Sequence, residues 1–231
     1  MASLKTILRK IRKELKVKEK VRDEIQADMR KATSLSKQAI LLIHQKRLKE
    51  ARKILEKAKE IISRLRELAE THPDIVYSGL YNVCLEEYAE ANIFLALIEE
   101  GRFATPEELN IPSVDYVLGL ADVIGEYRRL ALDALREGNI KRSEECLRIM
   151  DEIYTGLMAM NEAYMLVPGL RRKCDVARKV IETTRGDVTH EARRQSLEKY
   201  MKRLEKLERR FEKLEKGNID EFRRFKIQLF R

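Results

Sequence analysis

Two glutamates, Glu87 and Glu90, lie in the stretch LYNVCLEEYAEANIFLALIEEG (residues 80–101), which is apolar enough to form a buried helix. An apolar stripe with spacings of three and four residues runs along this stretch and includes both of them, whereas Glu86 falls off the stripe and is expected in solvent. Burying an ionised carboxylate costs on the order of several kcal/mol. The pair should therefore be neutralised by a proton, by Lys or Arg, or by a metal ion.

Two explanations of these glutamates remain open from the pattern. They could form salt bridges inside a helical bundle or line a cavity of an assembly. Alternatively, carboxylates at i and i+3 point the same way and supply the oxygen ligands that Mg²⁺ or Mn²⁺ prefers. A metal held there would lower the pKa of bound water and polarise a phosphodiester. Neighbouring helices could add Asp122, Glu126 or Asp151.

Other catalytic schemes have less support. The sequence has no Gly-rich phosphate loop, no GxSxG and no HExxH. The three cysteines are far apart with no CxxC spacing, which argues against a disulfide framework or a zinc site. The three histidines are scattered along the chain, so each is expected to be structural or exposed.

Composition points to an all-α protein with an affinity for polyanions. Helix formers dominate the 231 residues, with nine Gly, four Pro and no Trp. The formal net charge of +9 favours RNA or DNA as a partner. No leader-like N-terminus and no run of about 18 uncharged apolar residues is present, so we expect a cytoplasmic protein with no membrane segment.

Periodicity and breakers divide the chain into helices joined by short connectors, which predicts a single bundle. We expect helices over about 4–45, 47–70, 74–100, 113–138, 143–163 and 171–184. After Gly186 a separate helix carries a heptad seam of Leu197, Tyr200, Leu204, Leu207, Phe211 and Leu214. The predicted organisation is a helical domain over 1–187 and a helical extension over 188–231 that packs on it or on a partner subunit.

Five segments, in order and with matching spacing, resemble the translin and Trax family over about residues 20–187. They are RDEIQADMRKATSLSKQAI, EEYAEA, YVLGLADVIGEYRRLALDALREGN, IYTGL and LRRKCD. The resemblance implies an all-α fold of about seven helices that assembles into a hollow homo-oligomeric shell, an octamer, with single-stranded RNA or DNA on its inner surface. In that family, Trax subunits supply a Mg²⁺-dependent endoribonuclease and translin subunits mainly bind nucleic acid.

The stretch EEYAEA makes the chain look Trax-like. Trax carries its catalytic glutamates in an E-Y-x-E pattern, which falls here on Glu87 and Glu90, and translin lacks that pair. One position departs from the pattern, because Thr155 stands where Trax has an acid before Gly. Asp151, one helical turn earlier, and Glu126, in the segment that resembles the family's G-E-L stretch, are the candidates for the missing catalytic group, and Asp151 for the third metal ligand.

Basic side chains are the candidates for holding phosphates. The segment HQKRLKEARK resembles the basic segment that translins use for nucleic acid and offers Lys46, Arg47 and Arg52. Arg171 and Arg172 are further candidates. Few aromatics are available for stacking, so binding should be dominated by phosphate contacts and weakly sequence-specific. For Lys49 and Lys53 in the same segment, a solvated helix face with intrahelical ion pairs to Glu50 and Glu56 is an equally good explanation.

Three hypotheses follow for function. The first is a Mg²⁺-dependent endoribonuclease that cuts single-stranded RNA inside an oligomeric helical shell. The second is a translin-like protein that binds single-stranded RNA or DNA without cleaving it, and the third is a helical scaffold. The E-Y-x-E match favours the first, and the acid missing at Thr155 keeps the second open.

Overall fold

The computed structural model describes the backbone of residues 3–160 and 163–229, and the side chains of 3–160, 164–213 and 219. Within these residues it is all-α, with no strand, as composition predicted. Six long helices are present: α1 (Leu4–His44), α2 (Leu48–Thr71), α4 (Gly79–Glu99), α6 (Ser113–Arg136), α7 (Ile140–Ala159) and α9 (Leu170–Leu229). Three helices are only one turn long: α3 (Pro73–Val76), α5 (Pro106–Leu109) and α8 (Ala163–Leu166).

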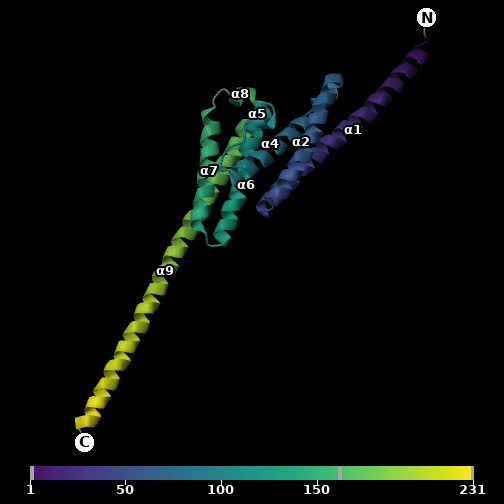
Figure 1. Cartoon of the computed structure of the whole chain (residues 1–231). Helices are drawn as coiled ribbons and strands as arrows, with labels where there is room; N and C mark the ends of the chain where they lie inside the picture. The colour runs from purple at the N-terminus through teal and green to yellow at the C-terminus, as the bar shows by residue number, and fades with distance from the viewer. Residues whose placement is uncertain (1–2, 161–162, 230–231) are drawn as a thin grey trace.

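The long helices form one bundle in which α4 and α6 are central (Figure 1). Helices α1 and α2 form a hairpin, α1 packs on α4, α4 packs on α6, and α6 packs on both α7 and α9. The buried core is continuous across these layers and includes the fully enclosed side chains of Met29, Leu65, Leu85, Phe94 and Ile124.

Local sequence signals explain where most helices begin and end. Lys46 adopts a left-handed conformation (φ 61°) in the turn between α1 and α2. The side chain of Asn139 accepts a hydrogen bond from the backbone N–H of Arg142, which places the start of α7 before the predicted Ser143. At α5, Thr105 and Glu108 form a capping box, which begins this one-turn helix.

The predicted break near Gly186 is wrong. Helix α9 is continuous for 60 residues, and a Cβ at Gly186 would meet no atom within 4 Å. Ile181, Thr184 and Val188 are buried on either side of this glycine, so packing against the bundle keeps the segment helical. Gly186 therefore lowers helix propensity at one position without ending the helix.

The two ends of the chain project from opposite ends of the bundle (Figure 1). The first half of α1 carries exposed apolar side chains such as Leu8 and Leu15. At the other end, the side chain of Gln195 donates a hydrogen bond to the carbonyl of Gly138, after which α9 runs free of the bundle. Leu214, the last residue of the predicted heptad seam, has a side chain outside the described residues.

Candidate functional site

Helices α4 and α6 approach unusually closely at Gly119. A Cβ at this position would lie 2.6 Å from the carbonyl oxygen of Glu86, 2.7 Å from the Cβ of Ala89 and 2.9 Å from the backbone nitrogen of Glu90. Real Cβ atoms do not approach backbone this closely, so only glycine fits between the two helices. As a consequence, Asp122 and Glu126 of α6 lie beside Glu87 and Glu90 of α4. These four residues form the acidic cluster.

Glu90 is the buried member of this group, with 8% of its surface exposed. Among the described residues its carboxylate accepts no hydrogen bond and forms no ion pair, although its oxygens are not sealed from solvent. Burial, together with the nearby carboxylates of Asp122, Glu126 and Glu87, raises the pKa of Glu90 to about 8, while Lys173 acts in the opposite direction. The ionised form of Glu90 is thus disfavoured, because Lys173 offsets only part of the effect of burial and of the neighbouring carboxylates.

Glu87 lies on the same helix but is only partly buried, with 21% of its side chain exposed. Its Oε1 lies 2.9 Å from Nζ of Lys37, which belongs to α1. The hydrogen bond and the charge of Glu87 raise the pKa of Lys37. One member of the predicted pair therefore has a salt bridge, and the other does not.

Glu126 contributes a third carboxylate from α6, and a buried histidine contacts it. His44 Nε2 lies 2.5 Å from Glu126 Oε2. The imidazole side chain is 5% exposed, and its ring centroid lies 5.1 Å from that of Phe94. Its second nitrogen, Nδ1, is buried without a hydrogen-bond partner in the described part of the chain. His44 is therefore a structural neighbour of the acidic group, which the scattered histidines of the sequence did not reveal.

Lys173 of α9 neutralises the outer edge of the cluster. Its ammonium donates hydrogen bonds to Asp122 at 2.5 Å and Glu86 at 3.0 Å. Burial acts to lower the pKa of Lys173, but the two carboxylates outweigh it, and the pKa is raised. The expectation that Glu86 lies free in solvent is wrong, since its side chain is 19% exposed and paired with this lysine.

The structure does not bring Asp151 to this cluster. Both of its carboxylate oxygens accept hydrogen bonds from the guanidinium of Arg185, at 2.7 and 2.9 Å, on the side of the bundle where α7 meets α9. Asp151 is also absent from the charges that shift the pKa of Glu90, whereas Glu126 is among them. Of the two candidates for the acid missing at Thr155, only Glu126 is placed near Glu90.

The four acidic residues Glu87, Glu90, Asp122 and Glu126 are not a ready-made metal site. Within the residues described, no group of three or more His, Cys, Asp and Glu side chains is arranged to hold an ion. Lys37 and His44 contact two of the carboxylates that a metal would need. The donor chemistry nevertheless fits a hard divalent cation, because the side chains are all carboxylates and Glu90 lacks a counter-charge in contact with it.

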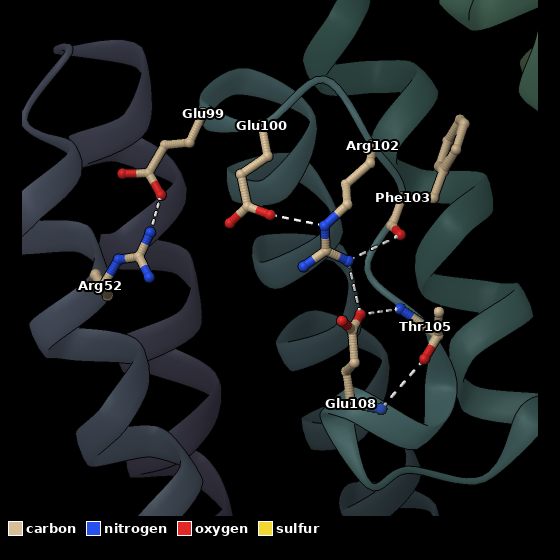
Figure 2. A network of polar contacts seen from close by, with 7 residues as sticks. All are labelled: Arg52, Glu99, Glu100, Arg102, Phe103, Thr105 and Glu108. Atoms are coloured by element: carbon tan, nitrogen blue, oxygen red, sulfur yellow. Dashed lines mark hydrogen bonds and ion pairs between the residues drawn. The ribbon is translucent and has the colours of Figure 1, made fainter.

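The predicted basic residues are spread over several surfaces. Arg47 pairs with Glu50 through two hydrogen bonds of 2.7 Å on the surface of α2. Arg52 contacts Glu99 at the end of α4, beside a separate network around Arg102 (Figure 2). Arg47 thus has an intrahelical ion pair of the kind expected of a solvated face, whereas Arg52 pairs with a different helix; both arginine side chains remain more than half exposed.

Two hollows place other basic residues near the acidic cluster. A groove of about 490 Å³ is lined by Glu86, Asp122, Arg172 and Lys173, and Arg171 is exposed next to it in sequence. A second hollow of about 450 Å³ lies at the α1–α2 turn. Its lining includes His44 and the basic residues Lys46, Arg136 and Arg142. The last two were not predicted, because they belong to different helices and share no sequence motif.

A translin family model matches residues 20–184. The chain belongs to the translin family. This translin-family chain is 33% identical over 188 residues to an uncharacterized protein of Methanocaldococcus jannaschii, a match that covers 80% of this chain and 83% of that protein. The predicted family is thereby confirmed.

Solved structures of C3PO proteins share the fold. The crystal structure of AfC3PO is 35% identical with a TM-score of 0.70, and the match covers 80% of this chain and 96% of that one. The structure of AfC3PO in complex with duplex RNA is 34% identical, with a TM-score of 0.69 and the same coverage. Apo-NeC3PO, at 24% identity and a TM-score of 0.71, matches in fold, over 82% of this chain and all of that one.

No helix within the described residues is both long and apolar enough to cross a bilayer.

Proposed function

We propose that this translin-family protein is a Mg²⁺-dependent endoribonuclease. The observation that supports the proposal is the state of Glu90: a buried carboxylate, surrounded by Glu87, Asp122 and Glu126, with its pKa raised to about 8. Proteins tolerate such an arrangement where a cation offsets the repulsion or where chemistry uses the acid. The E-Y-x-E pattern of Trax falls on the same residues.

Glu87, Glu90 and Glu126 are the residues that would hold the cation, which would have to compete with Lys37 and His44. Bound there, Mg²⁺ would supply Lewis-acid activation of a phosphodiester and of a water molecule. Gly119 fixes the spacing of the two helices that carry these acids. Lys173 holds Asp122 and Glu86 at the edge of the cluster and offers positive charge beside the groove.

RNA is the proposed substrate. AfC3PO, which is similar to this chain, has a structure in complex with duplex RNA. The net charge of +9 and the exposed Arg171 and Arg172 beside the acidic cluster support phosphate binding on the same face. We propose single-stranded RNA as the cleaved form, within a homo-oligomeric shell, an octamer, and duplex RNA belongs in the same assay as a comparison.

The test is cleavage of a labelled RNA by wild type, Glu87→Gln and Glu90→Gln, each with Mg²⁺ and with EDTA. Each substitution should abolish cleavage, because the amide keeps the shape but loses the charge that holds a hard cation. RNA affinity and the mass from light scattering should be unchanged. Asp151→Asn is the matched control: it also neutralises a helical carboxylate, but one paired with Arg185, and should retain activity.

Cleavage at the wild-type rate by either glutamine variant would refute the metal assignment. Loss of cleavage in Asp151→Asn, with its fold intact, would mean that Asp151 is needed for catalysis after all. A monomeric mass at micromolar concentration would remove the shell from the proposal.

The second candidate is a protein that binds nucleic acid without cleaving it. It is favoured by the salt bridges of Glu87 with Lys37 and of Glu126 with His44, which satisfy two of the acids without a metal. Wild-type protein that binds RNA in a salt-dependent manner, but leaves it intact with Mg²⁺ and with Mn²⁺, would establish this reading instead.

A further inference from the structure

The C-terminal part of α9 carries an apolar seam with nothing against it among the described residues. Its side chains are 42–67% exposed, although all of them are large: Leu197, Tyr200, Leu204, Leu207 and Phe211. The bundle itself makes its last described hydrogen bond to α9 at Gln195. Between residues 197 and 211 the helix therefore presents a continuous hydrophobic edge to solvent.

The spacing of the seam is that of a coiled coil. The residues alternate steps of three and four, so Leu197, Leu204 and Phe211 occupy a positions while Tyr200 and Leu207 occupy d positions. The remaining positions are dominated by Lys, Arg and Glu. A helix with one narrow apolar edge and charge elsewhere buries that edge against another helix of the same kind.

The flanking charges distinguish between the possible orientations of two such helices. Arg203 occupies a g position and Glu208 the following e position. In a parallel pair of identical helices, g of one chain faces the next e of the other, so Arg203 meets Glu208 twice by symmetry. In an antiparallel pair, g faces g and e faces e, which opposes like charges. The sequence continues the same g-to-e spacing with Arg210 and Glu215.

We propose that residues 197–213 of α9 pair in parallel with the same segment of a second copy of this chain. The interface would be the a/d seam, flanked on both sides by Arg203 and Glu208. This contact is separate from the acidic cluster and does not depend on nuclease activity. It would join two subunits of an assembly, or two assemblies, through their tails.

The other exposed apolar edge of the molecule is a poorer partner. Residues 4–20 of α1 carry eight Lys and Arg against two Glu, and residues 197–213 carry seven against four. Both segments are positively charged, but residues 4–20 carry a net +6 and residues 197–213 a net +3, so a contact between α1 of one copy and the tail of another would be opposed more strongly than a contact between two tails. Between two tails, the Arg203–Glu208 pairs offset part of this repulsion.

A disulfide test on the full chain separates the orientations. Leu197→Cys places a thiol at an a position near the start of the seam, where a parallel pair brings the two copies together and an antiparallel pair does not. The native Cys84, Cys146 and Cys174 are all buried. Under mild oxidation, Leu197→Cys should give a covalent dimer on a non-reducing denaturing gel. Lys202→Cys, at the outward f position, is the matched control. It should give several-fold less covalent dimer than Leu197→Cys.

Charge reversal in the Leu197→Cys background tests the flanking pair. Arg203→Glu alone, or Glu208→Arg alone, should reduce crosslinking several-fold, because each opposes like charges across the interface. The double variant Arg203→Glu with Glu208→Arg should restore crosslinking, as should a mixture of the two single variants. Neither reversal should destabilise the isolated helix. A glutamate at position 203 would gain the opposite charges of Lys199 and Lys206, and an arginine at position 208 would gain those of Glu205 and Glu212.

Three outcomes would overturn the proposal. Equal crosslinking of Lys202→Cys and Leu197→Cys would mean random collision. Crosslinking that is unchanged by both single charge reversals would refute the parallel register. A tail that serves RNA instead would give no covalent dimer, and RNA affinity would fall when Lys199 and Lys202 are changed to Glu. Circular dichroism on each variant confirms that the helices remain folded.

Discussion

The acidic cluster at the α4–α6 contact and the tail of α9 differ in which side chains are buried. In the cluster, carboxylates are drawn into the bundle, and Glu90 is buried with a raised pKa. In the tail, the charges remain in solvent and the leucines are exposed as well. The packing of the bundle core holds the acidic cluster in place. The leucines of the tail have no side chain packed on them among the described residues. Uncompensated charge in a core suggests a ligand, whereas uncovered leucines on a helix suggest another helix.

The largest expected effect is a difference in the free energy of unfolding between two leucine substitutions, one in each region. Leu85→Ala in α4 removes a side chain that is 1% exposed and should lower the free energy of unfolding by about 2–5 kcal/mol. Leu204→Ala, made in the Arg203→Glu background to keep the tail unpaired, should change it by less than about 0.5 kcal/mol. Denaturant unfolding of both proteins measures the difference. Equal losses would mean that the tail packs on its own bundle.

The second prediction concerns how closely α6 approaches α4. Gly119→Ala should destabilise the fold by about 1–3 kcal/mol, because the added methyl group would overlap the backbone of Glu86 and Glu90. Gly125→Ala on the same helix is the control. Its Cβ meets nothing within 4 Å, so the helix propensity of alanine should stabilise it by about 0.5–1 kcal/mol.

Thermal unfolding of the two variants gives the comparison directly. Opposite signs support the steric account of Gly119. A loss in both variants would mean that α6 needs glycine for a reason other than its contact with α4.

The sequence predicted the helical bundle well because each long helix has its own periodicity and stop signals. The helix ends predicted near residues 100 and 138 agree with the structure, in which α4 ends at Glu99 and α6 at Arg136, each shortly before a left-handed glycine, Gly101 or Gly138. Gly186 misled because propensity at one residue is weak against the packing of its buried neighbours. Such an override depends on tertiary contacts, which a single sequence does not display.

The candidate site could be predicted only in part, for a similar reason. Periodicity on α4 identified Glu90 as buried, which is correct, but it could not reveal that Lys37 pairs with Glu87 or that His44 contacts Glu126. These partners lie on α1, far away in the sequence, and an isolated Lys or His carries no signal. Asp151 was selected by helical spacing from Thr155, but pairs with Arg185 instead.

The last prediction turns the burial of Glu90 into a dependence of stability on pH. Its pKa is about 8 in the folded protein, and the unfolded chain should have the ordinary value of about 4.5. Between these values the folded state binds more protons than the unfolded state, so stability falls as pH rises from about 4.5 to about 8. Glu90→Gln removes this group without changing its shape, and the variant should lose less stability over that range.

The quantity to measure is the difference in melting temperature between Glu90→Gln and wild type at pH 5 and at pH 8, with EDTA present. The free energy of unfolding of the variant, relative to wild type, should rise between pH 5 and pH 8 by roughly 3 kcal/mol, because each pH unit between the two pKa values contributes about 1.4 kcal/mol. Glu198→Gln, on the exposed tail, is the control and should show no such change. A difference independent of pH would mean that Glu90 is ionised at little cost in the fold. The contrast between a carboxylate buried in the bundle and one in solvent would then disappear, and with it the main physical reason to place a cation beside Glu90.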